Sequence, residues 1–345
     1  MAGAPIAKVV SRTGSARPAP PANPLIRRIL ILLAVAFLTI FIVVPLVNVF
    51  VQALSKGVEG YVAVFHPPEA PEGATLTILQ KRHFGEGAAQ ATRTWNSIGM
   101  TLSVAAVVLP LNILFGLAAA WATTKFHFRG RTLLTSLIDL PFSVSPVVAG
   151  LVFVLLLGRN GIFGDWATHL TWPDVFSLHW IGFANGPWPF AFGRSFTGVI
   201  FTPLAIVLAS IFVTFPFVAR SLTPLMESLG SDEEMAALSL GASGWRTFFK
   251  ITLPNVKWAL LYGVILCAAR AFGEFGAVSV VSGHIDANDT MPLRIEKLWN
   301  EYNNQAAFTV ASVLALLAVV TLVAKTLIDW KTQGNERTSE GVSDA

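Results

Sequence analysis

The sequence contains little of what an enzyme or a soluble domain would need. Its one cysteine, Cys267, excludes an internal disulfide, and because it lies in an apolar run we expect a small buried hydrophobe there rather than a reactive thiol. Only 13% of the 345 residues are charged while 54% are hydrophobic, which excludes an ordinary soluble domain. The six histidines fall in predicted connections and no His-Glu-x-x-His spacing occurs, so no catalytic residue and no metal site is expected.

Long apolar runs are the dominant feature of the sequence. The runs cover residues 29–53, 97–122, 133–157, 198–219, 258–282 and 306–329. Each is long enough to cross the hydrocarbon core of a bilayer, about 30 Å thick, as a helix. The first run exceeds a signal-peptide core and lacks a clear small-residue cleavage site, so we expect it to remain in the membrane. The predicted fold class is all-α, a polytopic membrane bundle of six transmembrane helices.

The distribution of lysine and arginine predicts the orientation of this bundle. If the N-terminus is cytoplasmic, the cytoplasmic connections and tails carry fifteen of these cations and the external connections eight. The net charge of +4 therefore indicates membrane orientation and not a nucleic-acid partner. Both termini are expected to be cytoplasmic. The expected parts are a basic, disordered tail at 1–26, a transmembrane domain at 27–330 with external loops 54–96 and 158–197 and a cytoplasmic loop 220–257, and a cytoplasmic tail at 331–345.

Tryptophan and proline mark two further features. The second external loop carries Trp166, Trp172, Trp180 and Trp188. Such spacing suits the bilayer interface or a cap over an external mouth, and a sugar-stacking platform is the alternative, although no carboxylate pair accompanies it. Prolines within the spans are expected to bend helices, as a transport pathway or ordinary bundle packing can use. These are Pro110, Pro141, Pro146, Pro203 and Pro216.

The fourth and fifth runs are joined by residues 230–254, here called the elbow, which read GSDEEMAALSLGASGWRTFFKITLP. Ser231 and Glu234 spell a capping box that predicts the start of a short helix. Gly241 is expected to end this helix in a left-handed conformation. Ser243 is expected to cap a second helix, which gives way to the next element at Pro254.

Two short helices joined at a glycine would expose apolar side chains outside the bilayer. Water makes that exposure unfavourable, so we expect a partner protein to cover them. An amphipathic connector lying on the membrane or on its own bundle is the alternative.

The fifth run carries two charges near the expected middle of the membrane. Arg270 and Glu274 are one helical turn apart, and small residues around them would allow close helix packing. Charges at that depth are costly unless they are paired, hydrated or lining a pathway. They are predicted either to border a translocation route or to lock the bundle as a structural pair.

At the elbow the sequence resembles the importer permeases of the ABC superfamily. Their cytoplasmic loop has the pattern Glu-Ala-Ala, three residues, Gly, nine residues, Ile, one residue, Leu-Pro. This chain matches at every position except the first, where Met235 replaces the glutamate, and Glu234 next to it is one residue out of register. The resemblance implies that the following residues contact the ATPase: Glu234, Met235, Ala236, Ala237, Leu240, Gly241, Ile251, Leu253 and Pro254.

A closer resemblance, from about residue 198 to 330, is to sulfate/thiosulfate permeases of that superfamily. It is carried by LGASGWRTFFKITLPNVKWALLYGV and ARAFGEFGAVSVVSG, whereas the first third is similar mainly in hydropathy. The resemblance implies a type I ABC importer permease in a bacterial inner membrane, in contact with lipid. Its expected partners are a second, related permease subunit, two ATPase subunits that bind ATP and Mg²⁺, and a periplasmic sulfate/thiosulfate-binding protein.

The chain has no P-loop of the form GxxxxGK[ST], so it is not expected to hydrolyse ATP by that route. The resemblance implies a non-catalytic subunit that binds no cofactor itself. Three alternatives stay open at this point. The cargo could be another oxyanion such as molybdate or tungstate. The chain could instead be an ion-coupled carrier with Arg270 and Glu274 as its relay, or an intramembrane enzyme, for which the sequence offers no nucleophile and base pair.

Overall fold

A computed structural model describes residues 24–68, 77–170, 197–283 and 286–343. The chain divides into two compact units, Met1–Asn48 and Val49–Ala345. The described part of the first unit is helical: α1 (Pro24–Leu38) continues through a π-helical segment, η1 (Thr39–Val43), into α2 (Val44–Ala53), which ends in the second unit. Together they form a 30-residue apolar helix, which confirms the first predicted span.

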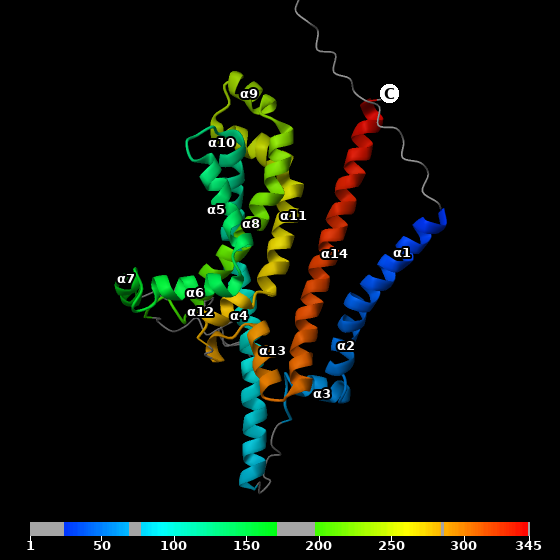
Figure 1. Ribbon diagram of the computed structural model, residues 1–345, viewed down its shortest axis with the longest axis vertical. Helices are drawn as coiled ribbons and strands as arrows, with labels where there is room; N and C mark the ends of the chain where they lie inside the picture. Colours follow the sequence, from blue (N-terminus) through cyan, green and yellow to red (C-terminus); the bar gives the residue numbers. More distant parts are fainter. Residues whose placement is uncertain (1–23, 69–76, 171–196, 284–285, 344–345) are drawn as a thin grey trace, which may run out of the picture. The chain divides into compact units, whose positions relative to one another are not determined.

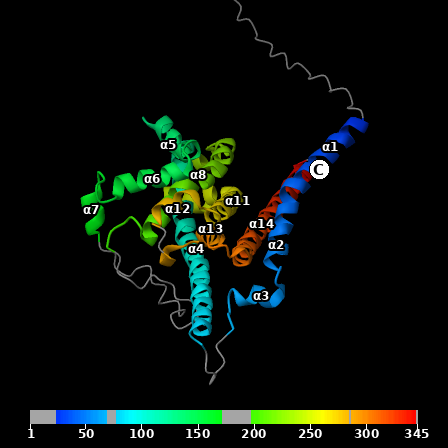
Figure 2. The same ribbon diagram turned by 60° about the horizontal axis from the view of Figure 1, so that its bottom comes forward.

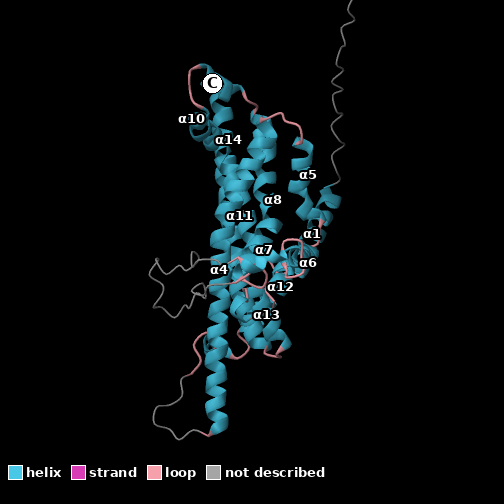
Figure 3. Ribbon diagram, turned by 90° about the vertical axis from the view of Figure 1, so that its left-hand side faces the viewer, coloured by secondary structure: helices cyan, strands magenta, loops and turns pink. Residues whose placement is uncertain are grey.

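The described part of the second unit contains helices and loops but no strand (Figure 3). Its helices are α3 (Gly57–Ala63), α4 (Ile78–Lys125), α5 (Arg131–Ser143), α6 (Pro146–Leu157), α7 (Gly164–His169), α8 (Pro203–Leu229), α9 (Asp232–Ser239), α10 (Gly244–Thr247), the π-helical η5 (Phe248–Thr252), α11 (Leu253–Phe272), α12 (Gly276–Val281), the 3₁₀ turn η6 (Asp286–Asn288), α13 (Met291–Asn300) and α14 (Asn304–Ser343). Figure 1 shows α9 and α10 at one end of this unit and α3 and α13 toward the other.

Among the described residues, five helices are long and apolar enough to cross a membrane, or six if α5 and α6 count as one bent span. The predicted third span is therefore not a straight helix. The helix axis bends by 112° between α5 and α6, at Val144 and Ser145. Pro146 explains the break, because proline disfavours helical backbone in the residue before it and is favoured in the first turn of a new helix. The predicted fifth span ends early as well, at Phe272, and α12 follows after a short gap.

Several predicted connections are helical instead. Residues 54–96 contain α3 and the first five turns of α4, so the expected loop is mostly helix. At the other end, α8 extends to Leu229, and α14 continues through most of the expected C-terminal tail. These extensions were not predicted because they contain residues that usually signal a helix end, Gly85 and Gly87 in α4, Pro224 in α8 and Gly334 in α14. Trp166 lies exposed in α7, whereas Trp172, Trp180 and Trp188 lie outside the described residues.

The central helix α8 packs against α4 and α11, and small residues set how closely these helices approach. A Cβ added at Gly116 of α4 would lie 2.7 Å from the Val218 Cβ, and one at Gly263 of α11 would lie 2.1 Å from the Ser221 Oγ. Buried between the three helices, the Asn112 Nδ2 donates to the Thr214 Oγ1 at 2.6 Å. Close packing and buried hydrogen bonds replace the hydrophobic driving force that is weak between helices in lipid.

The short helix α12 lies across α6, so that two broken helices pack against each other (Figure 2). Gly150 of α6 faces the Ala277 carbonyl, which a Cβ would approach to 2.7 Å, and Gly276 faces Pro146. Gly276 and Ala277 of the fifth run thus serve the predicted close packing, although they do so in a separate helix and not within one long span, whereas Ala269 and Gly273 are exposed.

At the end of the second unit away from the elbow, α13 carries a group of ion pairs. Lys297 of α13 lies 2.9 Å from the Asp286 Oδ1 and 2.8 Å from the Asp289 Oδ2, and Arg93 of α4 lies 3.2 Å from the Asp286 Oδ2. Lys297 donates a hydrogen bond that lowers the pKa of Asp286. Burial, in contrast, raises the pKa of Asp289, and the attraction of Lys297 and Arg294 only partly offsets it.

We predict that Lys297→Met destabilises the protein by roughly 3 kcal/mol at pH 8, since removing one partner leaves the buried Asp289 charge uncompensated. A carboxyl with a raised folded-state pKa favours folding below its unfolded pKa of about 3.9 and loses that contribution as pH rises through the folded value. The penalty should therefore shrink on acidification, as measured by thermal unfolding in detergent between pH 8 and pH 4.

The matched control is Arg82→Met, which removes an exposed ion pair with Glu86 on α4. It should cost at most about 1 kcal/mol, because solvent screens such pairs. Equal penalties for the two variants, or a Lys297→Met penalty that grows on acidification, would contradict the assignment.

Candidate functional site

The elbow begins with α9, although not with the predicted capping box. Ser231 precedes the helix but its side chain makes no cap hydrogen bond. The Glu234 carboxylate is engaged elsewhere, with Lys125 and Thr252, so it does not reach back to the Ser231 backbone. Three acidic residues, Asp232, Glu233 and Glu234, still occupy the first turn, where the helix dipole favours negative charge.

The predicted turn at Gly241 is confirmed. Gly241 has φ +83°, and its N–H donates to the Leu238 carbonyl at 3.0 Å while the Ala242 N–H donates to the Ala237 carbonyl at 3.0 Å. This pair of hydrogen bonds is a Schellman motif, which satisfies the last carbonyls of α9. A Cβ at Gly241 would meet no atom within 4 Å, so the backbone conformation alone requires glycine here.

The second helix of the elbow begins as predicted and does not end as predicted. The Ser243 Oγ accepts a hydrogen bond from the Arg246 N–H at 3.4 Å, which confirms the N-cap. After four residues of α10 the chain stays helical through η5 into α11, so no separate element ends at Pro254. Proline in the first turn of α11 is tolerated where the backbone hydrogen bonding shifts to the π pattern.

One face of the elbow is apolar and exposed. Leu240 at the turn is 89% exposed and Trp245 on α10 is 74% exposed. Trp245 stacks on Phe249 with ring centroids 5.9 Å apart, which holds both rings at the surface. The exposed large apolar residues of the elbow are Met235, Leu238, Leu240, Trp245 and Phe249. Exposed apolar clusters of this kind occur at protein–protein and membrane contact sites.

The opposite face of α9 is tied to the bundle by polar contacts. The Lys125 Nζ, at the end of α4, lies 3.1 Å from the Glu234 Oε2, and the Thr252 Oγ1 donates to the Glu234 Oε1 at 2.7 Å. The Asn255 Nδ2 of α11 donates to the Glu233 Oε2 at 2.6 Å. Glu234 therefore faces inward, away from the exposed apolar surface. Sequence spacing gave no sign that Lys125, Thr252 and Asn255 belong to this site.

The remaining predicted elbow residues divide between surface and interior. Ala236 is exposed on α9, and Ala237 is half-buried behind the turn. Ile251 lies in η5 and Leu253 begins α11, both half-buried, while Pro254 is exposed. The elbow residues are thus brought together, whereas Arg270 and Glu274 lie apart from them, at the far end of α11.

Arg270 and Glu274 form an ion pair across the break between α11 and α12. The Arg270 Nη2 lies 3.2 Å from the Glu274 Oε2, and the Glu274 Oε1 accepts the Ala277 N–H at 3.0 Å. Their predicted placement on one continuous helix is wrong, because α11 ends at Phe272. The Glu274 side chain is almost completely buried and satisfies the start of α12, whereas that of Arg270 is 39% exposed. Glu274 therefore bonds within the fold, whereas part of the Arg270 side chain remains exposed.

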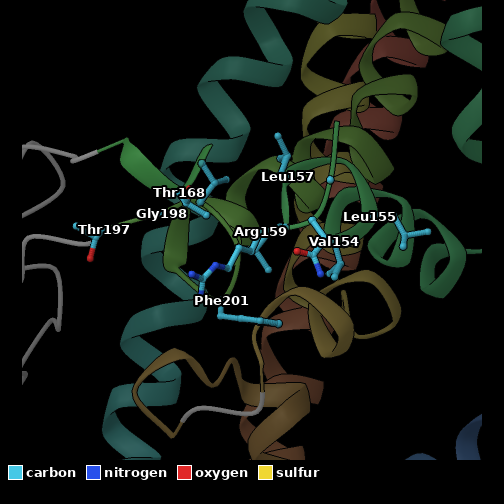
Figure 4. Close-up of a pocket in the computed structure, with 13 residues that line it drawn as sticks. Val154, Leu155, Leu157, Arg159, Thr168, Thr197, Gly198 and Phe201 are labelled. Atoms are coloured by element: carbon cyan, nitrogen blue, oxygen red, sulfur yellow. The ribbon is translucent and has the colours of Figure 1, made fainter. Parts of the chain in front are cut away.

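A separate cavity of about 570 Å³ lies beyond the end of α6. Figure 4 shows Arg159, Thr168 and Phe201 around it, contributed by the loop after α6, by α7 and by the turn before α8. No residue of the elbow, and neither Arg270 nor Glu274, lines it. Among the described residues, no group of His, Cys, Asp and Glu side chains could hold a metal ion.

Comparison with known proteins shows which family the chain resembles. Residues 112–333 match the family described as binding-protein-dependent transport system inner membrane component. The chain is 40% identical over 300 residues to the sulfate transport system permease protein CysW of Escherichia coli K12, covering 87% of this chain and 86% of that protein. It is 36% identical over 224 residues to the E. coli permease protein CysT, covering 65% and 72%.

A solved structure shares the fold. The crystal structure of a bacterial alginate ABC transporter in complex with an alginate-pentasaccharide-bound periplasmic protein contains a chain that aligns with a TM-score of 0.60 at 15% identity, covering 88% of this chain and 92% of that one. Together with the matched residues, this places a multi-pass, apolar helical chain among transport permeases. The chain belongs to the family of binding-protein-dependent transport system inner membrane components.

Proposed function

We propose that this chain is a permease subunit of an ATP-driven importer that carries sulfate or thiosulfate across a bacterial inner membrane. The observation that supports sulfate as the transported anion is the 40% identity to sulfate permease proteins over most of both chains. The same relatives include two permease types, CysW and CysT, which supports a heterodimer of this chain with a second permease. The solved relative contains a periplasmic protein, which supports delivery of the anion by a periplasmic binding protein.

Coupling is proposed to occur at the elbow. Two ATPase subunits, which bind ATP and Mg²⁺, would cover its exposed apolar face, and this chain would bind no cofactor. This arrangement requires the elbow end of the second unit, and both termini, to be cytoplasmic, in agreement with the excess of cations on that side. Closure of the ATPases would displace the elbow, and the chain would pass that displacement to α8 and α11, its neighbours in sequence.

The translocation route is proposed to run past the breaks at α5–α6 and α11–α12. Broken helices are tolerated in membranes where they are packed in protein or line a water-filled path, and transporters often bind substrate at such breaks. Arg270 is partly exposed beside one break, and the exposed Ser145 precedes α6 at the other. Positive charge and polar hydrogen-bond donors suit a dianion passing through, with Glu274 holding α12 in place.

Uptake by the reconstituted four-part transporter tests the proposal. Proteoliposomes containing both permeases, the ATPase and the binding protein should accumulate radiolabelled sulfate only with internal ATP and be insensitive to an uncoupler. Excess thiosulfate should compete and molybdate should compete weakly. Uptake that needs an ion gradient and not ATP would support the carrier alternative, and stronger competition by molybdate or tungstate would change the cargo.

The Gly241 turn gives a second prediction. Gly241→Val should lower ATP-dependent uptake by roughly tenfold, since a left-handed β-branched residue costs more than the roughly 1–2 kcal/mol that other L-residues lose there. Gly241→Asn is the matched control and should retain most uptake, because asparagine visits this conformation and nothing crowds the side chain. Normal coupled transport in the valine variant would contradict the role of the turn.

Arg270 gives a third prediction. Arg270→Ala should reduce uptake by roughly tenfold or more while the complex still assembles, since hydrogen bonds to charged groups contribute about 1.5–3 kcal/mol. Arg270→Lys keeps the charge and should retain part of the activity. Failure of assembly in both variants would instead identify the ion pair as a structural lock, and unchanged uptake in Arg270→Ala would exclude the residue from the route.

A further inference from the structure

The covalent chain connects the elbow to two spans only. The elbow follows α8 through Gly230 and continues into α11 through η5, so a displacement of the elbow reaches those helices directly. The long helix α4 ends at Lys125, more than a hundred residues earlier in the sequence, so it does not continue directly into the elbow. Because α4 packs along α8 within the bundle, α4 can follow the elbow indirectly, and any direct attachment of α4 to the elbow itself must be a side-chain contact.

Lys125 makes that contact. Its Nζ lies 3.1 Å from the Glu234 Oε2 and also donates to the Gly230 carbonyl, at the joint between α8 and α9. The Lys125 side chain is only 9% exposed and that of Glu234 17% exposed, so water screens this ion pair little. A shielded, hydrogen-bonded pair holds its geometry better than a surface pair does.

The carboxylate of Glu234 joins a second segment at the same time. Its other oxygen accepts the hydroxyl of the buried Thr252 in η5, and the next residue back, Glu233, accepts from Asn255 of α11. The first turn of α9 is thus bound to α4, η5 and α11. The Trp121 ring of α4 also contacts Phe248 of η5, with centroids 5.0 Å apart, as a parallel link between α4 and the elbow.

The space around these groups leaves no room for a substrate. The crevice bordered by Lys125, Glu234 and Thr252 measures about 20 Å³, which accommodates no more than a water molecule. Ligand binding therefore does not account for the buried charges. The three partners come from different elements, which points to mechanical attachment.

We propose that Lys125 and Glu234 are positioning residues for coupling: their ion pair fastens α9 to α4, so that displacement of the elbow moves three spans together. The inference rests on the proposed function, because it assigns a role within ATP-driven import. The ion pair stabilises one rigid body made of the elbow and the adjoining ends of α4, α8 and α11. Without it, the end of α4 no longer follows α9 closely, and a larger share of the ATP is hydrolysed without import.

The direct test is the number of sulfate ions imported per ATP hydrolysed by the reconstituted transporter. Lys125→Met and Glu234→Gln should each lower this ratio by roughly threefold to tenfold, the effect of losing about 0.7–1.4 kcal/mol. The exchanged pair Lys125→Glu with Glu234→Lys should recover much of it. The control Arg131→Met removes an exposed ion pair with Glu227 at the same end of the unit and should leave the ratio unchanged.

A reversible covalent link separates coupling from folding in a single protein. In the variant Lys125→Cys with Glu234→Cys, a short bifunctional methanethiosulfonate reagent can join the two thiols, and the native Cys267 is fully buried and out of reach. The linked transporter should show a near-normal ratio, and reduction of the linker should lower it. Equal ratios in the linked and reduced forms, or normal ratios in both single variants, would overturn the inference.

The controls distinguish this result from failure of the proposed function. If the unmodified transporter couples sulfate import to ATP hydrolysis and the Lys125 and Glu234 variants do so equally well, only the tie between α9 and α4 is wrong. If the unmodified transporter imports no sulfate with ATP, the proposed function is wrong and the inference falls with it.

Discussion

One constraint dominates the elbow: exposed apolar side chains are unfavourable in water unless another surface covers them. Leu240, Trp245 and Phe249 are held outward by a glycine turn and a stacked ring pair, and none of the described residues buries them. The inward face of α9 is, in contrast, fully engaged in hydrogen bonds and an ion pair. The elbow is thus fixed to the bundle by polar contacts on one face and exposes apolar side chains on the other. This combination suits transmission of force from a soluble protein to a membrane bundle.

A second constraint governs the interior. In a bilayer the backbone must satisfy its own hydrogen bonds, so breaks in helices are placed where other protein covers them. The breaks between α5 and α6 and between α11 and α12 lie next to each other, and Gly150 and Gly276 allow the two short helices to pack closely. Glu274 completes this arrangement by accepting a backbone N–H of α12. Arg270 is then left partly exposed beside a break, which is the physical basis for placing it on the route.

Local signals in the sequence predicted local structure well. Gly241 and Ser243 determine a turn and a cap through contacts within a few residues, and both were confirmed. The capping box failed because Glu234 had a stronger partner in Lys125, which lies far away in the sequence. The bend at Pro146 and the end of α11 at Phe272 were missed because an apolar run of span length hides a break inside it. Family resemblance identified the elbow, but only the fold brought Lys125, Thr252 and Asn255 to it.

The most direct test of the account is photo-crosslinking from the elbow in the assembled transporter. A photoreactive residue in place of Leu240, which is 89% exposed, should capture the ATPase subunit, with a yield that changes when ATP binds. The same residue in place of Tyr302, which is 90% exposed in the turn between α13 and α14 at the far end of the unit (Figure 1), should not capture it. If sulfate still accumulates with ATP while the Leu240 position captures no ATPase, the elbow is not the coupling surface and the central claim is contradicted.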